Sequence, residues 1–118
     1  MRDIKPDLLR ALQRLNANTA AAFPGKELAL PLVVVADETG RVAAQADGWA
    51  YLEEYVAAVD IYAHTQTAAD ALALQADGIL TALGFRRTFQ QDLYDEAAYA
   101  WRKRLRYRAL LRNDTIYQ

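Results

Sequence analysis

The stretch Ala98-Tyr-Ala-Trp-Arg-Lys-Arg-Leu-Arg-Tyr-Arg-Ala-Leu-Leu-Arg-Asn113 alternates between apolar and basic residues. The apolar set is Tyr99, Trp101, Leu105, Tyr107, Ala109 and Leu111, and the basic set is Arg102, Arg104, Arg106, Arg108 and Arg112. Successive side chains of a β-strand point to opposite faces, so the stretch predicts a strand with one face on a core and an arginine row on the other. Lys103 falls in the apolar set, where its stem could snorkel along that face or a bulge could turn it outward.

The composition fits one α+β domain over residues 1–118 with a core of its own. The net charge is −1, but basic residues gather after Arg86, whereas the middle of the chain is acidic. The absence of cysteine excludes disulfides, thiolate chemistry and cysteine-based zinc sites, and serine is absent too. The N-terminus is charged and the longest apolar run, 28–36, contains Pro31, so we expect neither a signal peptide nor a membrane span.

The N-terminal residues predict a helix over 5–15. Asp3 is placed to cap it, Pro6 stands in the first turn, where a missing N–H is tolerated, and a leucine stripe follows. The stripe is Leu8, Leu12 and Leu15. We expect Thr19–Phe23 to add a further helical turn before Pro24-Gly25 ends it.

The middle of the chain predicts two strands separated by an ambiguous segment. The β-branched run 30–36 predicts the first strand, and Asp37–Gly40 predicts a turn after it. Residues 41–47 fit either a return strand or a mobile loop, with a second turn signal at Asp47-Gly48. Alternation from Tyr51 to His64 predicts the second strand. Its core face is Tyr55, Val59 and Ile61.

The C-terminal half predicts a helix and a hairpin. Thr67-Ala-Ala-Asp70 is a variant capping box, apolar residues follow at helical spacing, and Gly84 supplies the stop. The stripe is Leu72, Ala76, Ile79, Leu80 and Leu83. Residues 85–93 predict a third strand, which the turn Tyr94–Ala97 joins to the strand described first, making the two antiparallel neighbours.

The resulting order is α-β-β-α-β-β. Two hairpins separated by a helix predict an α+β fold, in which a four-stranded, mainly antiparallel or mixed sheet carries its helices on one face.

Residues for catalysis are few. His64 is the only histidine, so a two-histidine metal site is excluded, and no threonine stands in a nucleophile elbow or glycine run in a phosphate loop. An enzyme would need His64 with Asp60 or Glu54 in a cleft. Asp70 and Asp77 lie two turns apart on the polar face of the second helix, which is typical of a solvated face. We therefore expect no catalytic residue, no metal and no cofactor.

The row Arg102, Arg104, Arg106 and Arg108 is the main functional signal. Arginines at alternate strand positions stand about 7 Å apart and form a positive stripe, which fits a nucleic-acid backbone or an acidic protein surface. It also fits a solvated face that cross-strand pairing with Glu54 and Asp60 partly neutralises. The aromatic residues of the strand lie on its other face, which argues against base stacking beside the arginines.

Several segments, in their order and spacing, resemble the tail terminator or tail-completion proteins of long-tailed bacteriophages and prophages. They extend from about Leu30 to Asn113. They are Pro31-Leu-Val-Val-Val35, Asp47-Gly48 before Tyr51, Tyr55-Val-Ala-Ala-Val-Asp-Ile-Tyr62 before a capped helix, Leu83-Gly-Phe85, and Leu105-Arg-Tyr-Arg108.

The resemblance implies a non-enzymatic virion protein, made in the host bacterial cytoplasm and located in the tail or neck. Such a protein forms a ring, typically a hexamer, which caps the tail tube and joins it to the head connector. A head–tail joining protein of the same neck region fits as well. The partners implied are further copies of the chain, the tail tube protein, the connector protein and DNA passing through the ring, with no membrane.

Two roles of the charged residues follow as hypotheses. The arginines either pair with Glu53, Glu54 or Asp60 of a neighbouring subunit, or they line the DNA passage. Heterologous interfaces close such rings, and open strand edges could join the subunits. The alternative is a small nucleic-acid-binding α+β module that uses the basic strand face.

Overall fold

The computed structural model describes residues 4–15, 17–20, 29–46, 50–112 and 115–117; for 20, 37–46, 50–52, 112 and 115–117 it describes the backbone alone. The elements are α1 (Lys5–Leu12), β1 (Asn18–Ala20), β2 (Leu32–Ala46), β3 (Ala50–Ala63), α2 (Gln66–Ala82), β4 (Arg86–Asp95), β5 (Ala100–Arg112) and β6 (Thr115–Tyr117).

The strands form one mixed sheet in the order β1-β2-β3-β5-β4. Strand β6 pairs with β5 beyond Arg86, the first residue of β4. Among the described strands, only β1 and β2 are parallel neighbours, and each of the other pairs is antiparallel. The α+β class is confirmed, and the four expected strands are present. The short strands β1 and β6 were not predicted and make the sheet six-stranded.

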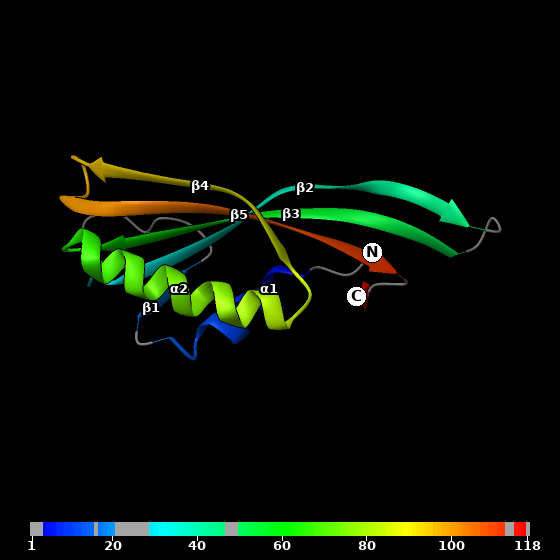
Figure 1. Cartoon of the computed structure of the whole chain (residues 1–118), viewed down its shortest axis with the longest axis horizontal. Helices are drawn as coiled ribbons and strands as arrows, with labels where there is room; N and C mark the ends of the chain where they lie inside the picture. The colour runs from blue at the N-terminus through cyan, green and yellow to red at the C-terminus, as the bar shows by residue number, and fades with distance from the viewer. Residues whose placement is uncertain (1–3, 16, 21–28, 47–49, 113–114, 118) are drawn as a thin grey trace.

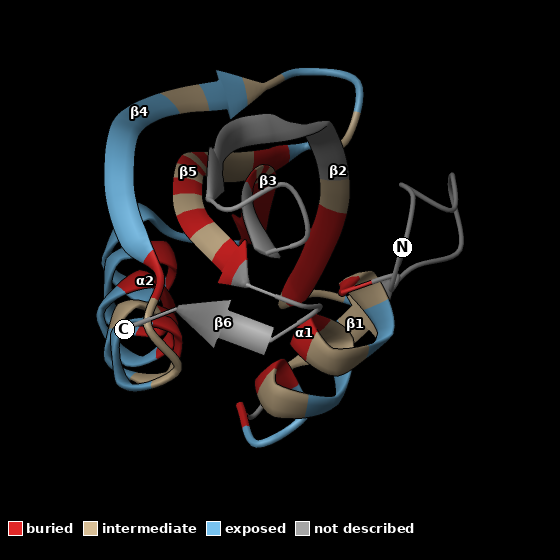
Figure 2. Cartoon of the chain, turned by 90° about the vertical axis from the view of Figure 1, so that its right-hand side faces the viewer, coloured by how far each residue is buried: buried red, intermediate tan, exposed pale blue. Residues whose placement is uncertain are grey.

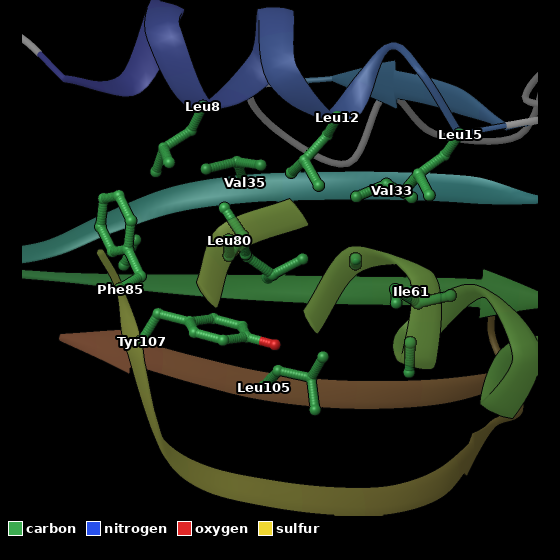
Figure 3. Close-up of a cluster of buried hydrophobic side chains, with 14 of the residues drawn as sticks. Leu8, Leu12, Leu15, Val33, Val35, Ile61, Leu80, Phe85, Leu105 and Tyr107 are labelled. Carbon is green, nitrogen blue, oxygen red and sulfur yellow. The ribbon is translucent and has the colours of Figure 1, made fainter. Parts of the chain in front are cut away.

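Both helices pack on one face of the sheet (Figure 1). Leu8, Leu12 and Leu15 point from the N-terminal segment to β2, and Leu80 of α2 points to the same core (Figure 3). From the sheet, this core receives alternate residues of β2, β3 and β5. They are Val33, Val35, Tyr55, Ala57, Val59, Ile61, Ala63, Leu105, Tyr107, Ala109 and Leu111. The predicted core face of β3 is therefore confirmed.

Strand β2 differs most from the sequence-based prediction. The expected turn at Asp37–Gly40 is wrong, because the strand continues to Ala46 and stays paired with β3. The turn-forming residues are absorbed in a register irregularity between Asp37 and Thr39, as happens at a β-bulge. Residues 41–46 are neither a return strand nor a loop but the far end of β2, and Asp47-Gly48 lies outside the described residues.

The β2–β3 hairpin projects beyond the helices along the long axis of the molecule (Figure 1), whose extents are 51 × 24 × 23 Å. The last described pair of this hairpin is Ala46 with Ala50.

The helix ends differ from the prediction as well. Helix α1 ends at Leu12, and its N-cap is Ile4 without a side-chain cap; Asp3 lies outside the described residues. Thr19 belongs to β1, not to a helical turn, because it pairs with Val33 of β2; residues 21–23 of the expected turn lie outside the described residues.

Helix α2 is capped by Thr65, whose hydroxyl accepts a 3.1 Å hydrogen bond from the backbone N–H of Ala68. The expected capping box at Thr67–Asp70 is therefore wrong, and Asp70 is left for another partner. Gly84 ends the helix segment with φ 101°, a conformation that favours glycine, so the predicted stop is confirmed.

Candidate functional site: the open face of the sheet

The arginine row lies on the sheet face away from the helices. Arg102 pairs with Tyr62, Arg104 with Asp60 and Arg106 with Ala58, without a register shift along this part of β5. Residues opposite each other in a sheet share a face, so the predicted alternation is confirmed from Trp101 to Leu111. The prediction is wrong for Tyr99, which precedes β5 and is exposed. Figure 2 shows it as buried and partly buried bands along the strand.

Asp60 holds two of these arginines. Its side chain is buried, and its Oδ2 accepts a 3.0 Å hydrogen bond from the guanidinium of Arg102. The Nε of Arg104 lies 3.6 Å from Oδ1 of the same carboxylate. Burial by itself lowers the pKa of Arg102, but the hydrogen bond and charge of Asp60 outweigh it and leave that pKa raised. Arg102 also lies over the ring of Tyr62, 5.5 Å from its centroid.

The other two arginines have partners on neighbouring strands. Arg108 donates from Nε to Oε2 of Glu54, and Arg106 lies 4.7 Å from the centroid of the Phe89 ring. Arg86 and Asp95 of β4 share this face through their partners Arg108 and Ala100. Among the described side chains, the open face thus combines five guanidiniums with the carboxylates of Glu54, Asp60 and Asp95, so it keeps an excess of positive charge. Pairing of the row with Glu54 and Asp60, one of the sequence hypotheses, is present within the chain.

Aromatic rings do accompany the arginines. The sequence argument considered the rings of β5 alone, which lie on the helix-covered face. Tyr62 comes from β3 and Phe89 from β4, and the register places both on the open face. Tyr62 is buried, so the objection to base stacking is weakened only at Phe89, which is exposed. The sequence argument missed Phe89 because cross-strand neighbours cannot be read from one strand.

Lys103 stands on the helix-covered face, and its register with β3 is regular, so a bulge is excluded. Its Nζ donates to Oδ1 of Asp70 at 2.8 Å and lies 3.1 Å from Oδ1 of Asp92. One amine therefore ties α2 and β4 to β5. Burial by itself lowers the pKa of Lys103, but the hydrogen bonds to Asp70 and Asp92 outweigh it, so the pKa is raised.

Tyr107 forms a second tie to α2. Its hydroxyl donates a 2.8 Å hydrogen bond to Oδ1 of Asp77, which also lies 3.8 Å from Arg87 of β4. Burial and this hydrogen bond raise the pKa of Tyr107. The expectation of a merely solvated pair is therefore wrong, since Asp70 and Asp77 both bond to β5. Lys103 in the apolar set was the one sequence signal for such a contact.

Glu53 and His64 lie apart from the arginine row. Glu53 is only 5% exposed and shares the helix-covered face with its neighbour in register, Leu111. His64 is exposed just after β3, whose last residue, Ala63, lies about 10 Å along the strand from Asp60 and farther from Glu54. The combination of His64 with Asp60 or Glu54 is therefore not brought together. Among the described residues, His, Asp and Glu form no group of three suited to a metal.

Within the described part of the chain, no helix is long and apolar enough to cross a membrane. No protein-family model matches the sequence, and no curated protein matches it. Among solved structures, the chain is similar to one from the "Virion of native gene transfer agent (GTA) particle". The TM-score is 0.55 and the identity 20%, and the match covers 92% of this chain and 91% of the other. This likeness establishes a shared fold over nearly the full length of both chains.

Proposed function

We propose that this protein is a structural subunit of a phage-like particle, which forms a ring at the end of a tail tube and joins the tube to the head connector. The observation that carries the proposal is the fold shared with a chain of a gene transfer agent virion over nearly its whole length. The resemblance of its sequence segments to tail terminator and tail-completion proteins narrows the role to the tail or neck. The chain acts by assembly, and its ring is a hexamer.

In this proposal the arginine row lines the passage for DNA. Glu54 and Asp60 already bind arginines of their own chain, and Glu53 lies on the opposite face, so none of the three is well placed for a neighbour's arginines. The remaining positive charge fits a surface along which a polyanion slides without being held in one register.

Sedimentation and negative-stain microscopy test the ring, with the protein alone and with tail tubes. We expect rings or caps at tube ends. The double variant Arg104→Ala/Arg106→Ala should keep its rings if the row faces the passage. The control is Arg10→Ala/Arg14→Ala, which removes the same charge from the exposed side of the N-terminal helical segment. A protein that forms no ring in either sample contradicts the proposal, and rings lost only in the first variant assign the row to subunit contacts.

A second candidate function is a small nucleic-acid-binding module. The observation in its favour is Phe89, an exposed ring that lies beside Arg106 on the positive face. A monomer that ignores tubes and shifts duplex DNA with a steep salt dependence would establish this function instead.

A further inference from the structure

The described part of the sheet has two open edges. Strand β2 pairs with β1 only from Leu32 to Val34, so from Val35 to Ala46 its outer edge meets no other described strand. Strand β4 pairs only with β5 among the described strands and is exposed over most of its length (Figure 2). Unpaired backbone N–H and C=O groups make each edge a template for another strand.

The register of β4 with β5 is irregular only near the start of β4. Arg86 and Arg87 begin the strand, and a register irregularity separates Arg87 from Phe89. Charges and bulges are the devices by which proteins block unwanted pairing at edges. From Phe89 to Asp95 the register with β5 is regular, so this part presents an edge without a bulge.

The two edges are complementary in direction. Because β2, β3, β5 and β4 are successively antiparallel, β2 and β4 run in opposite directions. Placing β4 of one copy beside β2 of the next therefore continues the antiparallel sheet. The contact joins two different surfaces, which is the kind that closes into a ring instead of stopping at a dimer.

The register of this contact is restricted by β1. A neighbouring strand cannot occupy the edge of β2 as far as Val34, because β1 is already paired there. Opposite residues must also share a face. Asp95 and Ala36 share the open face through Ala100 and Ala58, and aligning them clears β1. Beyond the irregularity after Asp37, this alignment brings Gln91 beside Arg41.

We infer that the subunit interface is this strand pair, in which Phe89–Asp95 of one copy extends the sheet along Ala36–Ala44 of the next copy. The inference rests on the ring proposed above and names its contact surfaces. In this register, β4 of one copy is shifted along β2 of the next copy. Such a shift is a shear, which a sheet needs in order to close on itself. The projecting β2–β3 hairpin (Figure 1) is the part of the molecule that supplies the free edge.

Cysteine cross-linking tests the interface, because the chain has no cysteine of its own. The variants are Arg41→Cys, Gln91→Cys, their double variant, and Ala71→Cys on the exposed side of α2 as a control. A short bismaleimide is added to the protein alone, or to the protein on tail tubes if it sediments as a monomer. Thr39→Cys with Leu93→Cys provides a second pair in the same register.

The double variant should give a ladder of cross-linked species, while a mixture of the two single variants should stop at dimers. Each single variant alone, and Ala71→Cys, should remain monomeric on a denaturing gel. Self-linking of Gln91→Cys would show a symmetric contact and overturn the inference. If micrographs show rings but neither cysteine pair gives a ladder, the inferred interface is wrong, while the proposed ring-forming function still holds. Absence of rings from the same samples would overturn the proposed function.

Discussion

Both faces of β5 carry polar ties, but in different surroundings. On the helix-covered face, Lys103 and Tyr107 each reach across to a carboxylate of α2 from a surface that is otherwise apolar. On the open face, Arg102 and Arg108 bond to carboxylates of β3 within the sheet and remain partly exposed. The first face fixes the helix on the sheet, and the second keeps charge available outside.

The comparison shows that the alternation of apolar and charged residues along β5 does not by itself tell how much each face contributes to the free energy of unfolding. Removing an ion pair beside water costs little stability, whereas truncating a buried apolar side chain, or removing one partner of a buried ion pair, costs much more. The covered face should therefore dominate stability, with Asp60 as the exception on the open face because its carboxylate is buried.

The largest effect is expected for Leu105→Ala. Leu105 is fully buried between the sheet and α2, so its truncation removes apolar contacts and leaves a cavity that costs about 3 kcal/mol of unfolding free energy. Urea denaturation measures the loss. The matched control is Arg106→Ala, the next residue on the opposite face, which should cost less than about 1 kcal/mol. Equal losses would contradict the comparison of the two faces.

Asp60→Asn should come next, at about 2 kcal/mol, because it leaves the half-buried guanidiniums of Arg102 and Arg104 without their shared carboxylate. Glu54→Gln is the control on the same face. Its partner Arg108 has a side chain that is 42% exposed, so we expect a loss below about 1 kcal/mol. Urea midpoints in the reverse order would show that burial does not separate the two pairs.

Tyr107→Phe should cost about 1 kcal/mol, since it removes the hydrogen bond to Asp77 and keeps the ring in the core. Thermal unfolding compares it with Tyr94→Phe, whose hydroxyl is on an exposed residue. A variant at Tyr107 that melts like the wild type would show that this tie does not hold α2 to the sheet.

The smallest effect is a loss of stability in alkali. Folding raises the pKa of both Tyr107 and Lys103, whose ordinary values are 10.0 and 10.5. The unfolded chain therefore releases these protons at a lower pH than the folded chain, so the stability is complete below about pH 9.5 and declines as the pH rises beyond it. Urea midpoints should stay level from about pH 8 to 9.5 and fall from there to about pH 11, less steeply for Tyr107→Phe. A midpoint that rises over this range would contradict the assignment.

The sequence by itself determined the main strands and the long helix of this protein. Alternation identified β3 and β5, helical spacing identified α2, and Gly84 marked its end; these signals are local and periodic, so single segments carry them. The arginine row and its pairing with Glu54 and Asp60 were also correct, because residues on the same face of neighbouring antiparallel strands meet.

Only the tertiary structure decided how the segments are used. Asp37–Gly40 reads as a turn, yet pairing with β3 carries β2 through it, because ladder hydrogen bonds outweigh a local turn preference. Asp70 and Asp77 look solvent-facing on their own helix, and the proximity of β5 gives them Lys103 and Tyr107 as partners. Which strand edges stay open likewise depends on where β1 ends. Such outcomes rest on contacts between residues distant in the chain, and no local pattern encodes them.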